Sequence, residues 1–174
     1  MSFVFVVSII AVFFVAHNFD GKEAQIHGQP LPNLFHRTDE INEMIFKLQE
    51  TCERELSIQI LSESPYILFV NLPPKTTPAV KSFQVFGIHP RELISTEFGI
   101  HYLEHLCGQS RFTTTEKSED LLDIEFGLVI NANPDSRILV ENGARCRRTN
   151  PNFVDIERNW DAYWSPVSPA NPQK

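Results

Sequence analysis

The sequence predicts an α/β domain in which helices cover a β-sheet, and two sets of segments support this prediction. Apolar or alternating segments typical of strands occur at residues 56–61, 66–71, 82–86 and 126–131. Helical spacing of apolar residues occurs at residues 38–48 and 92–106. Because strands that alternate with helices favour a sheet with helices packed on it, we expect helices on both faces.

The first expected helix begins at Thr38, whose side chain can cap it, and Asp39 and Glu40 are acidic residues in its first turn. Its apolar residues fall on one face, which should pack on the sheet: Ile41, Met44, Ile45 and Leu48. The second helix, from about Glu92 to Leu106, has apolar residues at helical spacing: Leu93, Ile94, Phe98, Tyr102 and Leu106.

Later elements are shorter. Ser118 can cap a helix start, and the strand at residues 126–131 leads into a turn at residues 133–137. A short helical segment then runs to about Glu141, and residues from 142 onward are loop-like. We therefore divide the chain into residues 1–20, 21–37 as a lead-in segment, 38–164 as the folded domain, and 165–174 as a Pro-rich tail.

Residues 3–16 (FVFVVSIIAVFFVA) form an uncharged apolar run of the length found in secretory signal peptides. The run is too short to span a bilayer comfortably, so we interpret residues 1–20 as a signal peptide and expect a secreted protein without a stable membrane span. A retained anchor is the alternative, because no Lys or Arg precedes the run and no clear cleavage site follows it.

The 174 residues carry a formal net charge of -7, without the basic face that a nucleic-acid-binding protein needs. We expect no nucleic-acid partner. The chain has three cysteines, Cys52, Cys107 and Cys146, so within this chain one thiol stays unpaired if the other two form a disulfide. The sequence does not decide the pairing.

His89 and Glu92 lie three residues apart where the strand at residues 82–86 gives way to the second helix. Imidazole nitrogen and carboxylate oxygen are both ordinary zinc ligands, and catalytic zinc sites usually combine three protein ligands with an open position. The two residues therefore predict part of a zinc site. The alternative is a surface loop at a helix start, since a His and a Glu often have this spacing by chance.

Three ordered segments, GIHPRE at residues 87–92, NPDSR at 133–137 and VDIERNW at 154–160, resemble the signature blocks of the zinc carboxypeptidase family of the A/B type. The resemblance covers roughly residues 34–164. It implies a three-layer α/β sandwich around a mixed, twisted sheet, with zinc as the cofactor at the ends of central strands. It also implies a C-terminally truncated domain, the N-terminal part of the catalytic domain only.

By motif position, the resemblance makes His89 and Glu92 the first two zinc ligands. Asp155 would be the carboxylate that orients the ligand His, and Arg158 would grip the C-terminal carboxylate of a peptide or protein substrate. The alternative for Asp155 is a helix-cap or turn carboxylate.

Arg147 or Arg148 would stabilise the oxyanion, and the alignment does not choose between them; the alternative is a solvated basic loop. Glu157 departs from the family, which usually has Asn there. Its charge would lie beside the substrate's carboxylate and repel it.

The resemblance also places a third ligand His, a catalytic Glu and a substrate-binding Tyr beyond Lys174. We therefore expect a zinc metallocarboxypeptidase that removes C-terminal residues by metal-assisted hydrolysis, with an incomplete site and little activity in this chain. One alternative is an inactive carboxypeptidase-like binding module that associates through an uncovered sheet edge. The other is an inverted zinc motif on the second helix, with His101 and His105 as ligands and Glu104 as the base.

Overall fold

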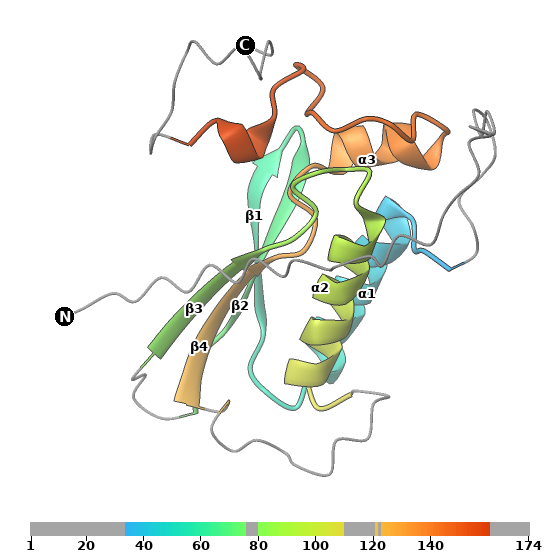
Figure 1. Cartoon of the computed structure of the whole chain (residues 1–174). Helices are drawn as coiled ribbons and strands as arrows, with labels where there is room; N and C mark the ends of the chain where they lie inside the picture. Colours follow the sequence, from blue (N-terminus) through green and yellow to red (C-terminus); the bar gives the residue numbers. More distant parts are fainter. Residues whose placement is uncertain (1–33, 76–79, 110–120, 122, 161–174) are drawn as a thin grey trace, which may run out of the picture.

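The computed structural model describes residues 34–75, 80–109, 121 and 123–160. The predicted signal peptide, most of the lead-in segment, the Ser118 helix start and the Pro-rich tail lie outside these residues. None of the described helices is long and apolar enough to cross a membrane. The elements run in this order (Figure 1): α1 (Thr38–Thr51), β1 (Ser57–Glu63), β2 (Tyr66–Leu72), β3 (Val80–Val85), α2 (Leu93–Leu106), β4 (Ile124–Val129), α3 (Pro134–Glu141) and the 3-10 helix η2 (Ile156–Arg158).

The strands form one mixed sheet in the order β1-β2-β4-β3. The pairs β1–β2 and β2–β4 are antiparallel, whereas β3 and β4 are parallel and are joined through α2. Val85 pairs with Val129, so β3 and β4 end at the same edge of the sheet. The predicted α/β class with a mixed sheet is confirmed, and the chain segments that leave this edge carry the candidate site.

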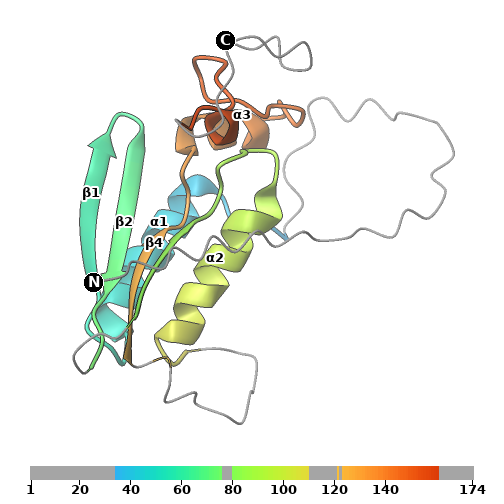
Figure 2. The ribbon, with the colours of Figure 1, turned by 60° about the vertical axis from the view of Figure 1, so that its left-hand side comes forward.

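The core lies between the sheet and the two long helices, which lie on the same side of the sheet in both views (Figures 1 and 2). The helices and strands contribute buried apolar side chains: Ile41, Ile45 and Leu48 from α1, Ile100, Leu103 and Leu106 from α2, and Leu68, Val70, Leu72, Phe126 and Leu128 from β2 and β4. The described residues thus form two layers, and the helices expected on the second face of the sheet are not among them. On the opposite face, Phe69 and Phe83 approach each other over Gly127, with ring centroids 6.2 Å apart.

Two details of the helices differ from the sequence-based expectation. The N-cap of α1 is Arg37, whose backbone N–H donates to Glu40, while the Thr38 hydroxyl donates to Glu141 at 2.7 Å. In α2, Ile94 and Phe98 are exposed, and the buried face runs through Ile100 and Leu103. The helix is apolar on more than one side, so spacing alone could not identify the side that meets the sheet.

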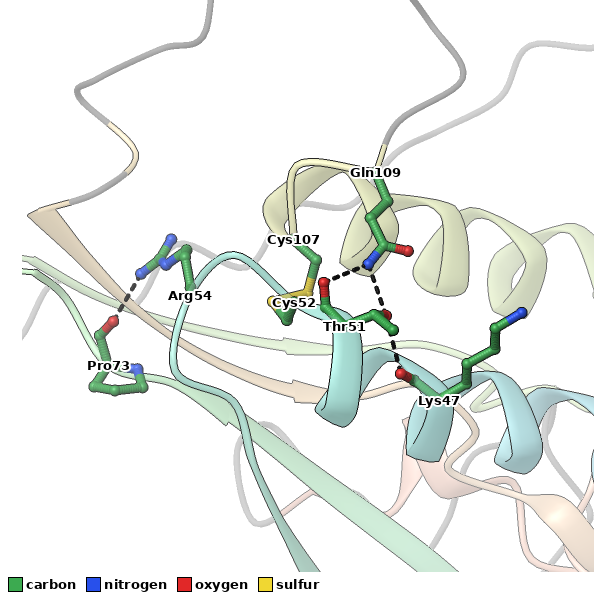
Figure 3. The surroundings of a disulfide bond; sticks show 7 residues. All are labelled: Lys47, Thr51, Cys52, Arg54, Pro73, Cys107 and Gln109. Atoms are coloured by element: carbon green, nitrogen blue, oxygen red, sulfur yellow. Dashed lines mark hydrogen bonds between the residues drawn. A yellow bond between two sulfur atoms is a disulfide. The ribbon is translucent and has the colours of Figure 1, made fainter.

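The C-terminal ends of α1 and α2 are joined by a disulfide between Cys52 and Cys107 (Figure 3). Beside it, the Gln109 side chain donates to both the backbone and the hydroxyl oxygen of Thr51 at 2.7 Å. The third cysteine, Cys146, is exposed and has a free thiol. The cross-link therefore fixes the two core helices at the end opposite the candidate site.

The other ends of the helices are held by Arg137 of α3, whose side chain is almost wholly buried. Its guanidinium lies 3.2 Å from Glu141 and 3.5 Å from Glu97 of α2, and it donates to the His36 carbonyl at 2.8 Å. Burial lowers the pKa of Arg137, and the two carboxylates oppose that effect. This buried ion cluster connects the chain before α1 to α2 and α3.

Candidate metal centre

His89 is positioned by the backbone that extends β3 beyond the sheet. Phe86 N–H donates to the Val129 carbonyl at 2.8 Å, and the Phe86 carbonyl accepts from Ala132 at 3.0 Å, so the pairing with β4 continues. Gly87 then turns the chain with a φ of 68°, and a Cβ there would lie 2.7 Å from the Thr96 hydroxyl. Only glycine fits this turn without strain.

The NPDSR segment supports the same loop, because the Asn133 side chain donates to the Ile88 carbonyl at 3.2 Å. Glu92 is the N-cap residue of α2, and its backbone N–H donates to the His89 carbonyl at 3.1 Å. The tight turn brings the two predicted zinc ligands to one side of the loop.

The imidazole of His89 is buried and has a carboxylate at each nitrogen. Nδ1 lies 3.2 Å from Glu92, while Nε2 lies 3.0 Å from Asp155 and 3.4 Å from Glu157. If Nε2 carries the proton and donates to Asp155, Nδ1 has a lone pair facing the Glu92 carboxylate. Two facing lone pairs repel, and a cation bound between His89 and Glu92 would remove this repulsion.

Asp155 lies at the start of η2 and is held by two arginines. Arg148 Nε donates to its carboxylate at 2.8 Å, and Arg158 also donates to it. Burial alone would raise the pKa of Asp155, but the hydrogen bonds from Arg148, His89 and Arg158 outweigh burial and keep this pKa well below the ordinary carboxyl range. Asp155 is therefore an anion that orients His89.

The two arginines that the sequence left undecided have different surroundings. Arg148 contacts Asp155, lies 3.4 Å from Glu92 and lies 3.5 Å from Glu157. Arg147 instead donates to the Asn150 carbonyl at 2.5 Å and stacks over the Phe153 ring at 4.3 Å. Of the pair, Arg148 is the one whose charge reaches the His89 region.

Glu157 is half exposed and turns toward His89 and Arg148. The Arg148 guanidinium offsets part of its negative charge, so the repulsion expected from the sequence is reduced by local pairing. This contact could not be read from the sequence, because the spacing of the motif does not show which way a loop side chain turns.

The donor set suits a zinc ion on the Nδ1 side of His89. Two ligand atoms, each about 2.1 Å from a tetrahedral zinc, lie about 3.4 Å apart, close to the 3.2 Å between His89 Nδ1 and Glu92. Within the described part of the chain, one three-residue group could also share a metal: His89, Asp155 and Glu157, with ligand atoms within 4.8 Å of one another. We favour the Nδ1 side, because Asp155 is already occupied by two arginines.

The residues of the inverted zinc motif do not join this site. His101 lies about 12 Å along α2 from the helix start, at 1.5 Å per residue. Its Nδ1 is paired with Glu104 of the same helix at 2.8 Å. Within the described ranges, the single group of three potential ligands is the one at His89, so the motif gathers no third ligand.

The mixed sheet and the His–Glu pair beyond the end of a strand agree with what the three sequence blocks predicted, but that strand, β3, is the last strand of the described sheet and not a central one. The sequence profile of the zinc carboxypeptidase family matches residues 53–174. The chain belongs to the zinc carboxypeptidase family.

Solved structures show the same fold. Thrombin activatable fibrinolysis inhibitor matches with a TM-score of 0.60 at 21% identity, over 75% of this chain and 35% of that chain. Carboxypeptidase A from Helicoverpa armigera matches with a TM-score of 0.59 at 18% identity, over 79% of this chain and 36% of that chain. A metallo-carboxypeptidase from Burkholderia cenocepacia matches with a TM-score of 0.59 at 21% identity, over 76% of this chain and 34% of that chain.

The matched region therefore spans about a third of the length of these proteins. No curated protein matches the chain.

Proposed function

We propose that this chain carries part of the active site of a zinc metallocarboxypeptidase, an enzyme that hydrolyses the C-terminal peptide bond of peptides and proteins. The observation that carries this proposal is the placement of His89, with Nδ1 facing Glu92 and Nε2 held by the Asp155 anion. This is the carboxylate–histidine arrangement that fixes the tautomer and orientation of a zinc ligand.

In this proposal, His89 and Glu92 hold zinc, and Asp155 keeps His89 in the tautomer that leaves Nδ1 free. Zinc, when bound, supplies Lewis-acid polarisation of the scissile carbonyl and an acidified water. The described residues supply two zinc ligands, His89 Nδ1 and the Glu92 carboxylate, whereas catalytic zinc sites ordinarily use three. The third ligand and the general base come from outside the described residues.

The two arginines around Asp155 take the substrate-facing roles. Arg158 has the more exposed side chain, and its planar guanidinium is suited to a bidentate grip on the substrate's C-terminal carboxylate. Arg148 stabilises the oxyanion and is preferred over Arg147, which is turned toward Phe153. Glu157 sets a negative charge beside this pair and limits how strongly they attract a carboxylate.

Measuring zinc affinity tests whether His89 and Glu92 hold zinc, and measuring the binding of a small molecule with a free carboxylate tests whether Arg158 binds the substrate's C-terminus. An N-acylated amino acid should bind the zinc-loaded chain with an affinity that falls when Arg158 is replaced by Met, while Arg147→Met should leave it nearly unchanged. Equal binding by the chain and its Arg158→Met variant would contradict the assignment of Arg158.

Secretion is part of the same proposal. The Cys52–Cys107 disulfide is typical of an oxidising compartment, and the apolar run at residues 3–16 is typical of a signal peptide. Expression with an epitope tag should place the protein in the culture medium, and retention in the cytosol with reduced cysteines would contradict it.

A non-catalytic binding role is the second candidate, and the edge of the sheet favours it. β3 is the last strand of the described sheet, and Val80 and Phe83 on it are about half exposed. Such an edge can pair with another strand, including β3 of a second copy. Analytical ultracentrifugation should then show dimers that a Phe83→Lys variant loses, and a monomer at all concentrations would exclude pairing between two copies of β3.

A further inference from the structure

Outside the site at His89, two histidines from distant parts of the sequence lie side by side. His36 precedes α1, and His101 lies in the middle of α2. Their ring centroids are 6.4 Å apart in an edge-on arrangement. The side chains are 38% and 42% exposed, so solvent and ions reach both rings.

Each of the two rings is held through the same nitrogen by its own carboxylate. His36 Nδ1 lies 2.7 Å from Glu97, and His101 Nδ1 lies 2.8 Å from Glu104. A carboxylate at this distance makes Nδ1 the protonated nitrogen of a neutral imidazole, which leaves the lone pair on Nε2. Both rings therefore have the tautomer that binds a metal through Nε2.

The two carboxylates that hold these rings are buried or mostly buried. Glu97 is buried, and besides His36 Nδ1 it accepts from the His36 backbone N–H at 2.9 Å and lies 3.5 Å from Arg137. Glu104 is mostly buried as well. Two carboxylates thus orient two partly exposed rings, and neither histidine belongs to the site at His89.

We propose that His36 and His101 bind a divalent transition-metal ion such as Zn²⁺ through their Nε2 atoms. A metal about 2.1 Å from each nitrogen places the ring centroids about 5 to 6 Å apart, and the observed centroid separation of 6.4 Å is close to that range. Glu97 and Glu104 do not bind the metal but hold the ligand histidines through Nδ1, and water completes the coordination. The metal ties the segment before α1 to α2.

A competing geometry uses the inverted zinc motif itself. His101 and His105 are four residues apart on α2 and so lie on one face of the helix, a spacing that can also hold a metal. The His36 arrangement is favoured because its two rings are both oriented by carboxylates in the structure. The two geometries share His101 and differ in the second histidine, which makes them separable.

The test is a calorimetric titration of Zn²⁺ into the full chain carrying His89→Ala, which removes the carboxypeptidase site. One binding event is expected. His36→Ala and His101→Ala should each weaken it at least about tenfold, and Glu104→Gln should weaken it about tenfold because outer carboxylates contribute 10–100-fold to metal affinity. His105→Ala is the matched control and should leave the affinity unchanged.

Absence of zinc binding in the His89→Ala chain would overturn the proposal, and so would loss of binding with His105→Ala but not with His36→Ala. Both His36→Ala and His36→Gln keep the backbone N–H bond to Glu97, and comparing their unfolding midpoints with that of the His89→Ala parent separates a loss of zinc binding from misfolding. Because the background lacks His89, the result is independent of whether the carboxypeptidase site binds zinc.

Discussion

Replacing Asp155 with Asn tests how the candidate metal centre is held together. The carboxylate binds His89 Nε2 at 3.0 Å and Arg148 at 2.8 Å, and it also binds Arg158. Asn keeps the shape but removes the charge, and its NH₂ group cannot accept from the arginines. The variant therefore loses the anion that orients His89 and leaves two guanidinium groups without their shared partner.

Two magnitudes follow for this variant. Loss of an outer carboxylate should weaken zinc binding about 10–100-fold, equivalent to about 1.4–2.7 kcal/mol. Breaking a fully buried ion pair costs about 3–5 kcal/mol, but Arg148 and Arg158 are partly solvated, so we expect a loss of about 1–3 kcal/mol in the free energy of unfolding.

Calorimetric zinc titration in a His101→Ala background and urea unfolding measure the two effects. Asp135→Asn is the control, because Asp135 is exposed in the first turn of α3 and lies outside the site. Zinc affinity and stability equal to those of the Asp135 variant would refute the role assigned to Asp155.

Three further changes probe the fold around the site. Arg137→Met should lower the free energy of unfolding by about 3 kcal/mol, since it leaves buried carboxylates without their cation; a loss near zero in urea unfolding would contradict this. Replacing Cys52 and Cys107 with Ser should cost about 4 kcal/mol by the chain-entropy relation for cross-linked loops, applied to their sequence separation of 55. An unchanged thermal midpoint would contradict it. Gly87→Ala should cost about 1–3 kcal/mol, because its φ is positive and the added Cβ meets Thr96. The same variant should also lose zinc affinity, and a variant that keeps both stability and zinc affinity would contradict the role of the turn.

The regular elements could be predicted because their periodicity is local. The strands at β1, β2 and β4 and the helices α1 and α2 begin and end within a few residues of the expected positions. The buried side of α2 could not be predicted, since Ile94 and Phe98 are as apolar as the residues that face the sheet. Which side is buried depends on where the strands lie, and that is not a local property.

In the candidate site, too, some features could be predicted from local sequence and others depend on how the chain folds. The motif blocks identified His89, Glu92 and Asp155, and the structure brings all three together. The choice between Arg147 and Arg148 depends on the path of a loop, because neighbouring side chains there point in different directions. The partner of each cysteine likewise depends on where the ends of α1 and α2 meet, which sequence spacing does not show.

The most direct test of the central claim is the zinc affinity of the chain in the His101→Ala background, compared with and without His89→Ala and Glu92→Gln. The proposed metal centre predicts one zinc site, weakened strongly by either change, and unaffected by His105→Ala. Zinc binding that does not depend on His89 and Glu92, or the absence of any binding at this site, would contradict it.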